Sequence, residues 1–174
     1  MDDMSIGAAP AEHMDEGAIM SLACTLYEQG AWAETFRLLR RLSASGERSA
    51  PLLYNMALCL DQAGQTERAL SCLEKALSSL RGGRRERRKP TGDEETLRIL
   101  YECQCARAGY RFPMRMEEAA CLPDYARERI LRLMITLCAR LGDAARVRSL
   151  AASLPGKHFD DVEKALAETA ERES

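Results

Sequence analysis

The sequence predicts an all-α fold made of about four helix-turn-helix units. The first observation is compositional: aromatic residues make up only 5%, strand-favouring clusters are scarce, and Ala, Leu, Glu and Arg dominate. The second is a repeated interval, since Gly30 and Gly64 are 34 residues apart and Gly109 and Gly142 are 33 apart. Each glycine follows an apolar helical pattern and precedes a new one. This repetition indicates a stack of similar helical hairpins.

One longer interval locates an insertion in this stack. Gly64 and Gly109 are 45 residues apart, and the 11 extra residues fall in the segment RGGRRERRKPTG, residues 81–92. The segment contains three Gly, one Pro and no apolar residue, which predicts a loop. We therefore expect a flexible N-terminus at 1–14 and a single domain at 15–174. Its units would span about 15–48, 49–80, 93–123 and 124–155, with the basic loop at 81–92 and a capping helix at 160–172.

Apolar residues recur at three- and four-residue spacing on both sides of each turn, as in amphipathic helices. In the second unit these positions are Leu53, Met56, Ala57 and Leu60, then Ala69, Leu73, Ala76, Leu77 and Leu80. In the first unit they are Ile19, Leu22, Ala23 and Leu26, then Trp32, Phe36, Leu39 and Leu42. Each predicted helix has one apolar face and needs a neighbour to cover it.

Local signals predict where several helices begin and end. Ser49 is a candidate N-cap for a helix with Pro51 in its first turn. The segment 91–94, TGDE, is a capping-box pattern that would begin the third unit. Pro113 is predicted to open a short second helix in that unit, and Pro123 to end it.

The C-terminal part has boundary signals of the same kind. Asp124 is predicted to cap the first helix of the fourth unit, and the segment 154–156, LPG, to close that unit. The last helix, 160–172, would bury Val162, Ala165, Leu166 and Thr169 on one side and cover the end of the stack.

These patterns resemble the tetratricopeptide repeat (TPR), over roughly residues 15–154. The second unit carries most of the resemblance, through Leu53, Met56, Ala57, Leu60, Gly64, Ala69, Leu73 and Ala76. The other units keep fewer positions: Thr35 and Val147 stand where a small Ala is expected, and Pro113 interrupts the third unit.

The resemblance implies a right-handed superhelix whose concave groove binds an extended peptide or a partner helix. The positions implied to face the groove are Met20, Cys24, Tyr27, Tyr54, Leu58, Asp61, Ile99, Cys103, Arg107, Arg132, Thr136 and Arg140. One subclass of the family clamps a C-terminal carboxylate with Lys and Asn on these faces. Met20 and Cys24 occupy the first-unit places here, which argues against that clamp.

The implied groove changes from apolar at the N-terminal units to basic at the fourth. We therefore expect a protein ligand with apolar anchors and acidic character near the fourth unit. The alternative is that the apolar positions are core, or are covered by the chain's own first dozen residues. That alternative applies to Met20, Cys24, Leu58, Ile99 and Cys103.

The insertion is strongly basic. Its cations are Arg81, Arg84, Arg85, Arg87, Arg88 and Lys89, and with Glu86 they give +5 in a chain whose net charge is −2. One interpretation is a salt-sensitive contact with nucleic acid or anionic lipid. The absence of interleaved aromatic residues favours the other interpretation, a solvated linker or a segment that docks on the molecule's own acidic surface.

The sequence predicts neither an enzyme nor a metal or cofactor site. The two histidines, His13 and His158, have no helical spacing to a Cys or carboxylate pair. Cys103 and Cys105 would point about 200° apart on one helix, so they cannot chelate one ion together. The usual zinc, phosphate-loop and serine-hydrolase motifs are absent, and we expect no small-molecule substrate.

Composition also suggests where the chain works. Seven cysteines, an odd number, favour free thiols in a reducing compartment. The acidic start, Met1–Met4, is unlike a secretory signal, and no apolar run is long enough to span a bilayer. A cytoplasmic protein is therefore expected.

The predicted function is a non-catalytic scaffold that binds a partner protein in the groove. The first alternative is a TPR-type chaperone of bacterial secretion substrates, and the second is an accessory nucleic-acid or anionic-lipid binder acting through residues 81–89. A homodimer through the apolar N-terminal side, with Trp32 and Phe36, is also left open.

Overall fold

The computed structural model describes residues 15–81, 92–108, 110–154, 156 and 158–173. These residues form helices joined by short turns and contain no strand, which confirms the predicted all-α class. The predicted flexible N-terminus and most of the basic loop lie outside the described residues. The helices are α1 Glu16–Glu28, α2 Trp32–Ala44, α3 Ala50–Gln62, α4 Thr66–Arg81, α5 Gly92–Ala108, α6 Met116–Cys121, α7 Pro123–Arg140, α8 Ala144–Ala151 and α9 Asp160–Glu173.

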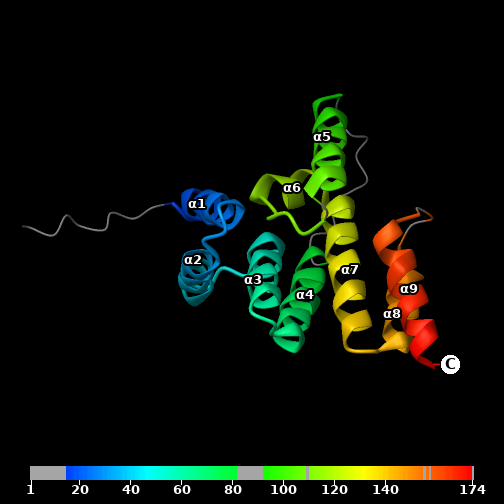
Figure 1. Cartoon of the computed structure of the whole chain (residues 1–174). Helices are drawn as coiled ribbons and strands as arrows, with labels where there is room; N and C mark the ends of the chain where they lie inside the picture. The colour runs from blue at the N-terminus through cyan, green and yellow to red at the C-terminus, as the bar shows by residue number, and fades with distance from the viewer. Residues whose placement is uncertain (1–14, 82–91, 109, 155, 157, 174) are drawn as a thin grey trace, which may run out of the picture.

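Helices α1 to α4 and α7 to α9 pack against their neighbours in a continuous series (Figure 1). Three hairpins, α1–α2, α3–α4 and α7–α8, form its successive layers, and α9 packs against α7 and α8 at the end. Helix α4 contacts α7 directly. The third predicted unit therefore does not lie between the second and fourth as a layer of its own.

Glycines explain why the three hairpins turn in the same way. Gly30, Gly64 and Gly142 have φ of 80°, 70° and 75°, which a residue with a side chain rarely adopts. In each turn the next residue's N–H bonds back to the helix, at 2.9 Å for Ala31 to Leu26, for example. The repeated glycine spacing thus reflects a left-handed residue needed to end each first helix.

The third unit differs from the sequence prediction. Helix α5 is followed by a non-helical segment, Tyr110–Arg115, which we call the strap, and only then by α6. Pro113 lies inside the strap, so the prediction that it opens a helix is wrong. The short helix α6 ends at Cys121, just before Pro123 as predicted, and Pro123 also begins α7, where its missing N–H has no partner to lose in a first turn.

Two predicted caps also need correction. Leu122, rather than Asp124, holds the N-cap position of α7, and Asp124 lies in the first turn. Ser49 holds the N-cap position of α3, but its side chain makes no capping bond. Its hydroxyl instead lies 3.6 Å from the sulfur of Met116. Thr91 and Glu94, the ends of the predicted capping box, lie outside the residues whose side chains are described.

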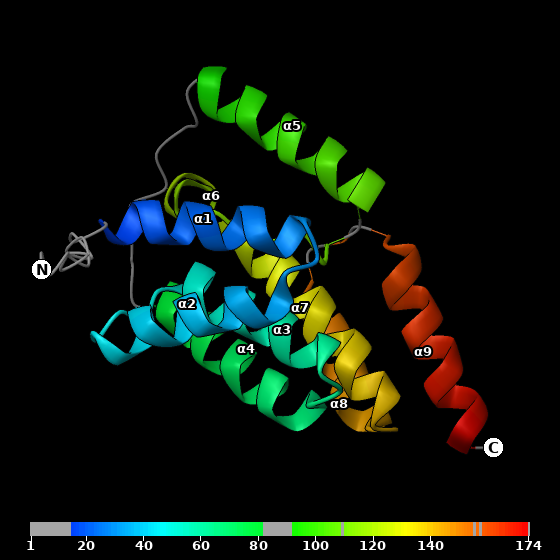
Figure 2. The ribbon, with the colours of Figure 1, turned by 60° about the vertical axis from the view of Figure 1, so that its left-hand side comes forward.

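Helix α5 stands apart from the stack in both views (Figures 1 and 2). It shares no extended packing interface with another described helix. Leu97, Ile99 and Leu100 are 40%, 49% and 55% exposed, whereas the large apolar residues of α3 and α7 are buried. The strap's N-terminal flank is therefore held only loosely by helix packing.

Candidate functional site

The face formed by α1, α3 and α7 is covered by the strap. Three strap residues are buried: Tyr110 and Met114, which belong to the core that α3, α4 and α7 share, and Pro113 between them. The other strap residues, Arg111, Phe112 and Arg115, stay partly exposed. The strap thus inserts two apolar anchors into the molecule and leaves its charged side chains at the surface.

Asn55 on α3 binds the strap through its main chain. Its amide oxygen accepts from the N–H of Met114 at 2.7 Å, and its amide nitrogen donates to the carbonyl of the same residue at 2.8 Å. The thiol of Cys24 on α1 lies 3.8 Å from that carbonyl. Asn55 is buried with the strap in place, and the backbone of Met114 satisfies both its donor and its acceptor.

Two further buried side chains bind strap carbonyls nearer its start. The hydroxyl of Tyr54 donates to the carbonyl of Tyr110. The guanidinium of Arg129 on α7 donates to the same carbonyl at 3.3 Å and to the carbonyl of Phe112. It also lies over the Tyr54 ring, with its central carbon 5.1 Å from the ring centre. The three helices therefore hold the strap mainly by its backbone.

Arg129 forms a buried ion pair with Glu118 on α6. Both side chains are 1% exposed, and a guanidinium nitrogen donates to a carboxylate oxygen of Glu118. Burial raises the pKa of the Glu118 carboxyl, while the charge of Arg129 acts in the opposite direction. The pair fixes α6 to α7 directly behind the strap.

The two strap arginines reach acidic residues at the rim of the face. Arg111 lies 3.4 Å from a carboxylate oxygen of Asp61 on α3, and Arg115 lies 3.5 Å from Glu28 on α1. Asp61 is also paired with Arg140 of α7. The rim beside the strap is therefore acidic on α1 and α3.

The structure brings most of the predicted groove residues of the first two units together, but beneath the strap. Met20, Cys24, Tyr54, Leu58 and Asp61 are buried, and Tyr27 is partly buried at the edge. The groove is thus not open at these positions. The alternative that these positions are core holds for Met20 and Leu58, which belong to the buried clusters. The first dozen residues, which the sequence offered as another cover, lie outside the described part.

The predicted residues of the third unit are placed elsewhere. Ile99 and Cys103 are exposed on α5, away from the α1–α3–α7 face. The side chain of Arg107 lies outside the described residues. These positions do not continue the groove, because α5 is not a layer of the stack.

The fourth-unit residues lie on the covered face and bind the chain's own groups. Arg132 donates to both carboxylate oxygens of Asp161, at 2.6 and 3.1 Å, and Thr136 is hydrogen-bonded to the hydroxyl of Tyr110. Arg140 is engaged by Asp61. The basic end of the face is thus neutralised internally, which removes the reason to expect an acidic ligand there.

Sequence reasoning missed Asn55, Arg129 and Glu118. Asn55 had a local signal, because it is the lone polar residue in APLLYNMALCL and sits on a helix that is otherwise apolar. Arg129 and Glu118 had none, since charged residues are common on helices and their burial depends on the strap. All three side chains are buried.

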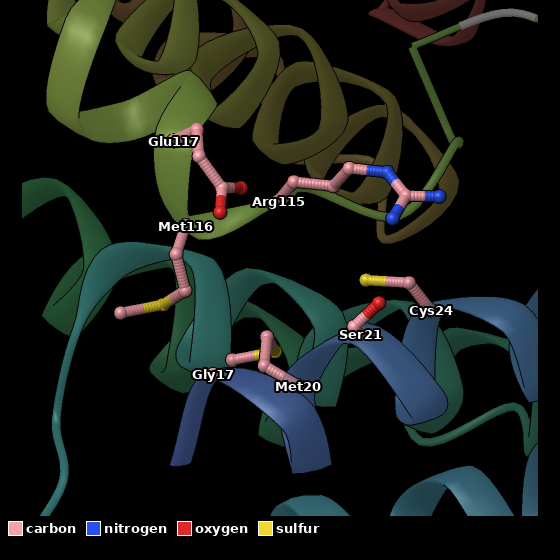
Figure 3. Close-up of a pocket in the computed structure, with 7 residues that line it drawn as sticks. All are labelled: Gly17, Met20, Ser21, Cys24, Arg115, Met116 and Glu117. Carbon is pink, nitrogen blue, oxygen red and sulfur yellow. The ribbon is translucent and has the colours of Figure 1, made fainter. Parts of the chain in front are cut away.

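A small pocket lies between α1 and the beginning of α6 (Figure 3). Its lining from α1 is Gly17, Met20, Ser21 and Cys24, and its other side is Arg115, Met116 and Glu117. The volume is about 60 Å³. Sites for small organic ligands have roughly 300 Å³ or more, so this pocket marks a gap beside the strap's end rather than such a site.

The cysteines are expected to react in two classes with iodoacetamide at pH 8. Burial raises the pKa of Cys24 to about 11 and of Cys59 to about 12, so little thiolate is present, while Cys103 and Cys121 are exposed. Mass spectrometry of the native protein should find Cys103 and Cys121 modified first. Equal rates at Cys24 and Cys103 would contradict the burial of Cys24 beside the strap.

Comparisons with known proteins add no assignment: no family model, curated protein or solved structure matches the chain. Within the described ranges, no three His, Cys, Asp or Glu side chains are grouped as metal ligands. None of the helices in that part combines the length and hydropathy needed to cross a bilayer.

Proposed function

We propose that the chain is a right-handed α-solenoid of TPR type that acts as a non-catalytic scaffold and binds a segment of another protein on its α1–α3–α7 face. One observation carries this proposal. Buried side chains from α3 and α7 hydrogen-bond the main chain of a non-helical segment, which at present is the strap. Side chains that satisfy backbone groups accept many sequences, as peptide recognition requires.

Photo-crosslinking tests this function at the rim of the face. Benzoylphenylalanine replaces Tyr27, which is partly buried at the rim, or Trp32, which is exposed on α2, a helix that does not form the face. Both substitutions are aromatic for aromatic and should preserve folding. In native extract, Tyr27→benzoylphenylalanine should form a covalent adduct with one protein that the Trp32 variant does not capture. Identical adduct patterns from the two positions would remove the support for a binding face here.

The two alternative functions, a secretion chaperone and a nucleic-acid or lipid binder, depend on different parts of the chain. A chaperone of bacterial secretion substrates would be a narrower form of the same proposal, because its client would place apolar anchors on this face. Binding of nucleic acid or anionic lipid rests on the basic residues 81–89, which lie outside the residues whose side chains are described. It stays a prediction from the sequence.

A further inference from the structure

We infer that the strap is a resident ligand of the α1–α3–α7 face and that the partner is a basic segment of the same chemistry, which takes the strap's place. This inference rests on the proposed function and specifies its partner. It follows from how the strap is held, how its flank is attached and which charges surround it.

A segment that covers this face has to bring backbone groups. Asn55 offers a donor and an acceptor 2.8 and 2.7 Å from one residue's carbonyl and N–H, and Arg129 and Tyr54 offer donors to carbonyls two to four residues earlier. All three side chains are buried beneath the strap, so a segment that covered them without pairing their polar groups would be disfavoured. A non-helical peptide satisfies them, whereas a partner helix, whose backbone groups are bonded internally, does not.

The charges define the incoming segment further. The strap reads YRFPMR, in which each buried anchor, Tyr110 and Met114, is followed by an arginine. Those arginines meet Asp61 and Glu28 at the rim, at 3.4 and 3.5 Å. The matching partner therefore carries an aromatic residue and an apolar residue four positions apart, each followed by a basic residue.

The strap is attached in a way that permits exchange. On its N-terminal side it follows α5, which has no extended packing interface with the other described helices and exposes Leu97, Ile99 and Leu100. Release of the strap with α5 would leave the contacts among α1–α4 and α7–α9 in place. The hairpin layers can thus persist while one segment replaces another.

A peptide with the strap's sequence tests the exchange in the full-length protein. Met114→Ala removes a buried anchor from the resident strap, and Leu73→Ala removes a buried side chain of α4 that belongs to the same core. A capped peptide of residues 110–116 should bind the Met114→Ala protein at least tenfold more tightly than the Leu73→Ala protein. Fluorescence anisotropy measures both affinities. A peptide in which Glu replaces both arginines should bind the Met114→Ala protein at least tenfold more weakly.

Hydrogen exchange shows where the peptide binds. Binding should speed exchange in residues 110–116 of the protein and leave α3 and α7 protected. Equal affinity for the two variants, or binding without faster strap exchange, overturns the inference. A natural partner crosslinked at position 27 while the strap peptide fails to exchange would leave the proposed function standing. Strap exchange with no crosslinked partner would count against the function alone.

Discussion

Replacing Arg129 with Met is expected to lower the free energy of unfolding by about 3–5 kcal/mol, because it leaves a buried carboxylate without its partner. Glu118 is 1% exposed and has Arg129 as its cation. The substitution also removes the donor to the carbonyls of Tyr110 and Phe112. Urea unfolding followed by circular dichroism measures the loss.

An exposed ion pair provides the matched control. Arg146 pairs with Glu74 between α8 and α4, but these side chains are 34% and 51% exposed. Arg146→Met should therefore cost about 0–1 kcal/mol, as is usual for surface pairs. If Arg129→Met and Arg146→Met lower the free energy of unfolding by the same amount, the Arg129–Glu118 pair is not buried as described above.

The pH dependence gives the Arg129→Met experiment a second readout. Burial raises the pKa of Glu118 above its ordinary value of 4.5, and Arg129 lowers it, so removing Arg129 raises it further. The folded variant then binds a proton more tightly than its unfolded chain. Its stability deficit relative to wild type should be smallest below pH 4.5 and grow as the pH rises towards 7. Glu118→Gln in the variant should recover part of the loss.

The three regular hairpins could be predicted because their causes are local. Gly30, Gly64 and Gly142 each supply the left-handed residue that ends a first helix, and this need recurs with the repeat. Ala57 and Ala69 are fully buried where α3 and α4 pack together, as small residues at a close helix contact should be. Turn geometry and apolar period are both visible in a short stretch of sequence.

The third unit was mispredicted because a period between glycines says nothing about the residues that follow. Gly109 fitted the period, so a short helix was predicted to begin at Pro113 and end at Pro123, whereas α6 begins only at Met116. The residues themselves alternate instead: the apolar Tyr110, Phe112 and Met114 are separated by Arg111 and Pro113. Apolar residues at every second position are not typical of a helix, and this pattern was the feature of the sequence that indicated a non-helical strap.

The covering of the face could not be predicted from the first two units. Asn55 and Met114 are 59 positions apart, and Cys24 and Met114 are 90 apart. Nothing in a helix's own sequence tells whether its apolar face meets solvent, a partner or a distant part of the same chain. Buried polar residues such as Asn55 are informative because each needs a partner, and the partner here is backbone.

Replacing Asn55 with Leu is expected to lower the free energy of unfolding by about 2–4 kcal/mol, since the buried N–H and carbonyl of Met114 both lose their amide partner. Leu has the same number and branching of side-chain heavy atoms as Asn and is somewhat larger, so the substitution leaves no cavity. Hydrogen exchange should show the Met114 amide exchanging much faster than in wild type, while the amides of α7 lose only the protection that follows from lower global stability.

Gln62→Leu is the matched amide substitution on the same helix. Gln62 is exposed and donates to the hydroxyl of Tyr27 at 3.2 Å, so its replacement should change stability by less than about 0.5 kcal/mol. Unchanged protection of Met114 in Asn55→Leu would mean that the strap is held by its anchors alone. In that case the backbone bonds would not explain why this face accepts a peptide, and recognition would depend on Tyr110 and Met114.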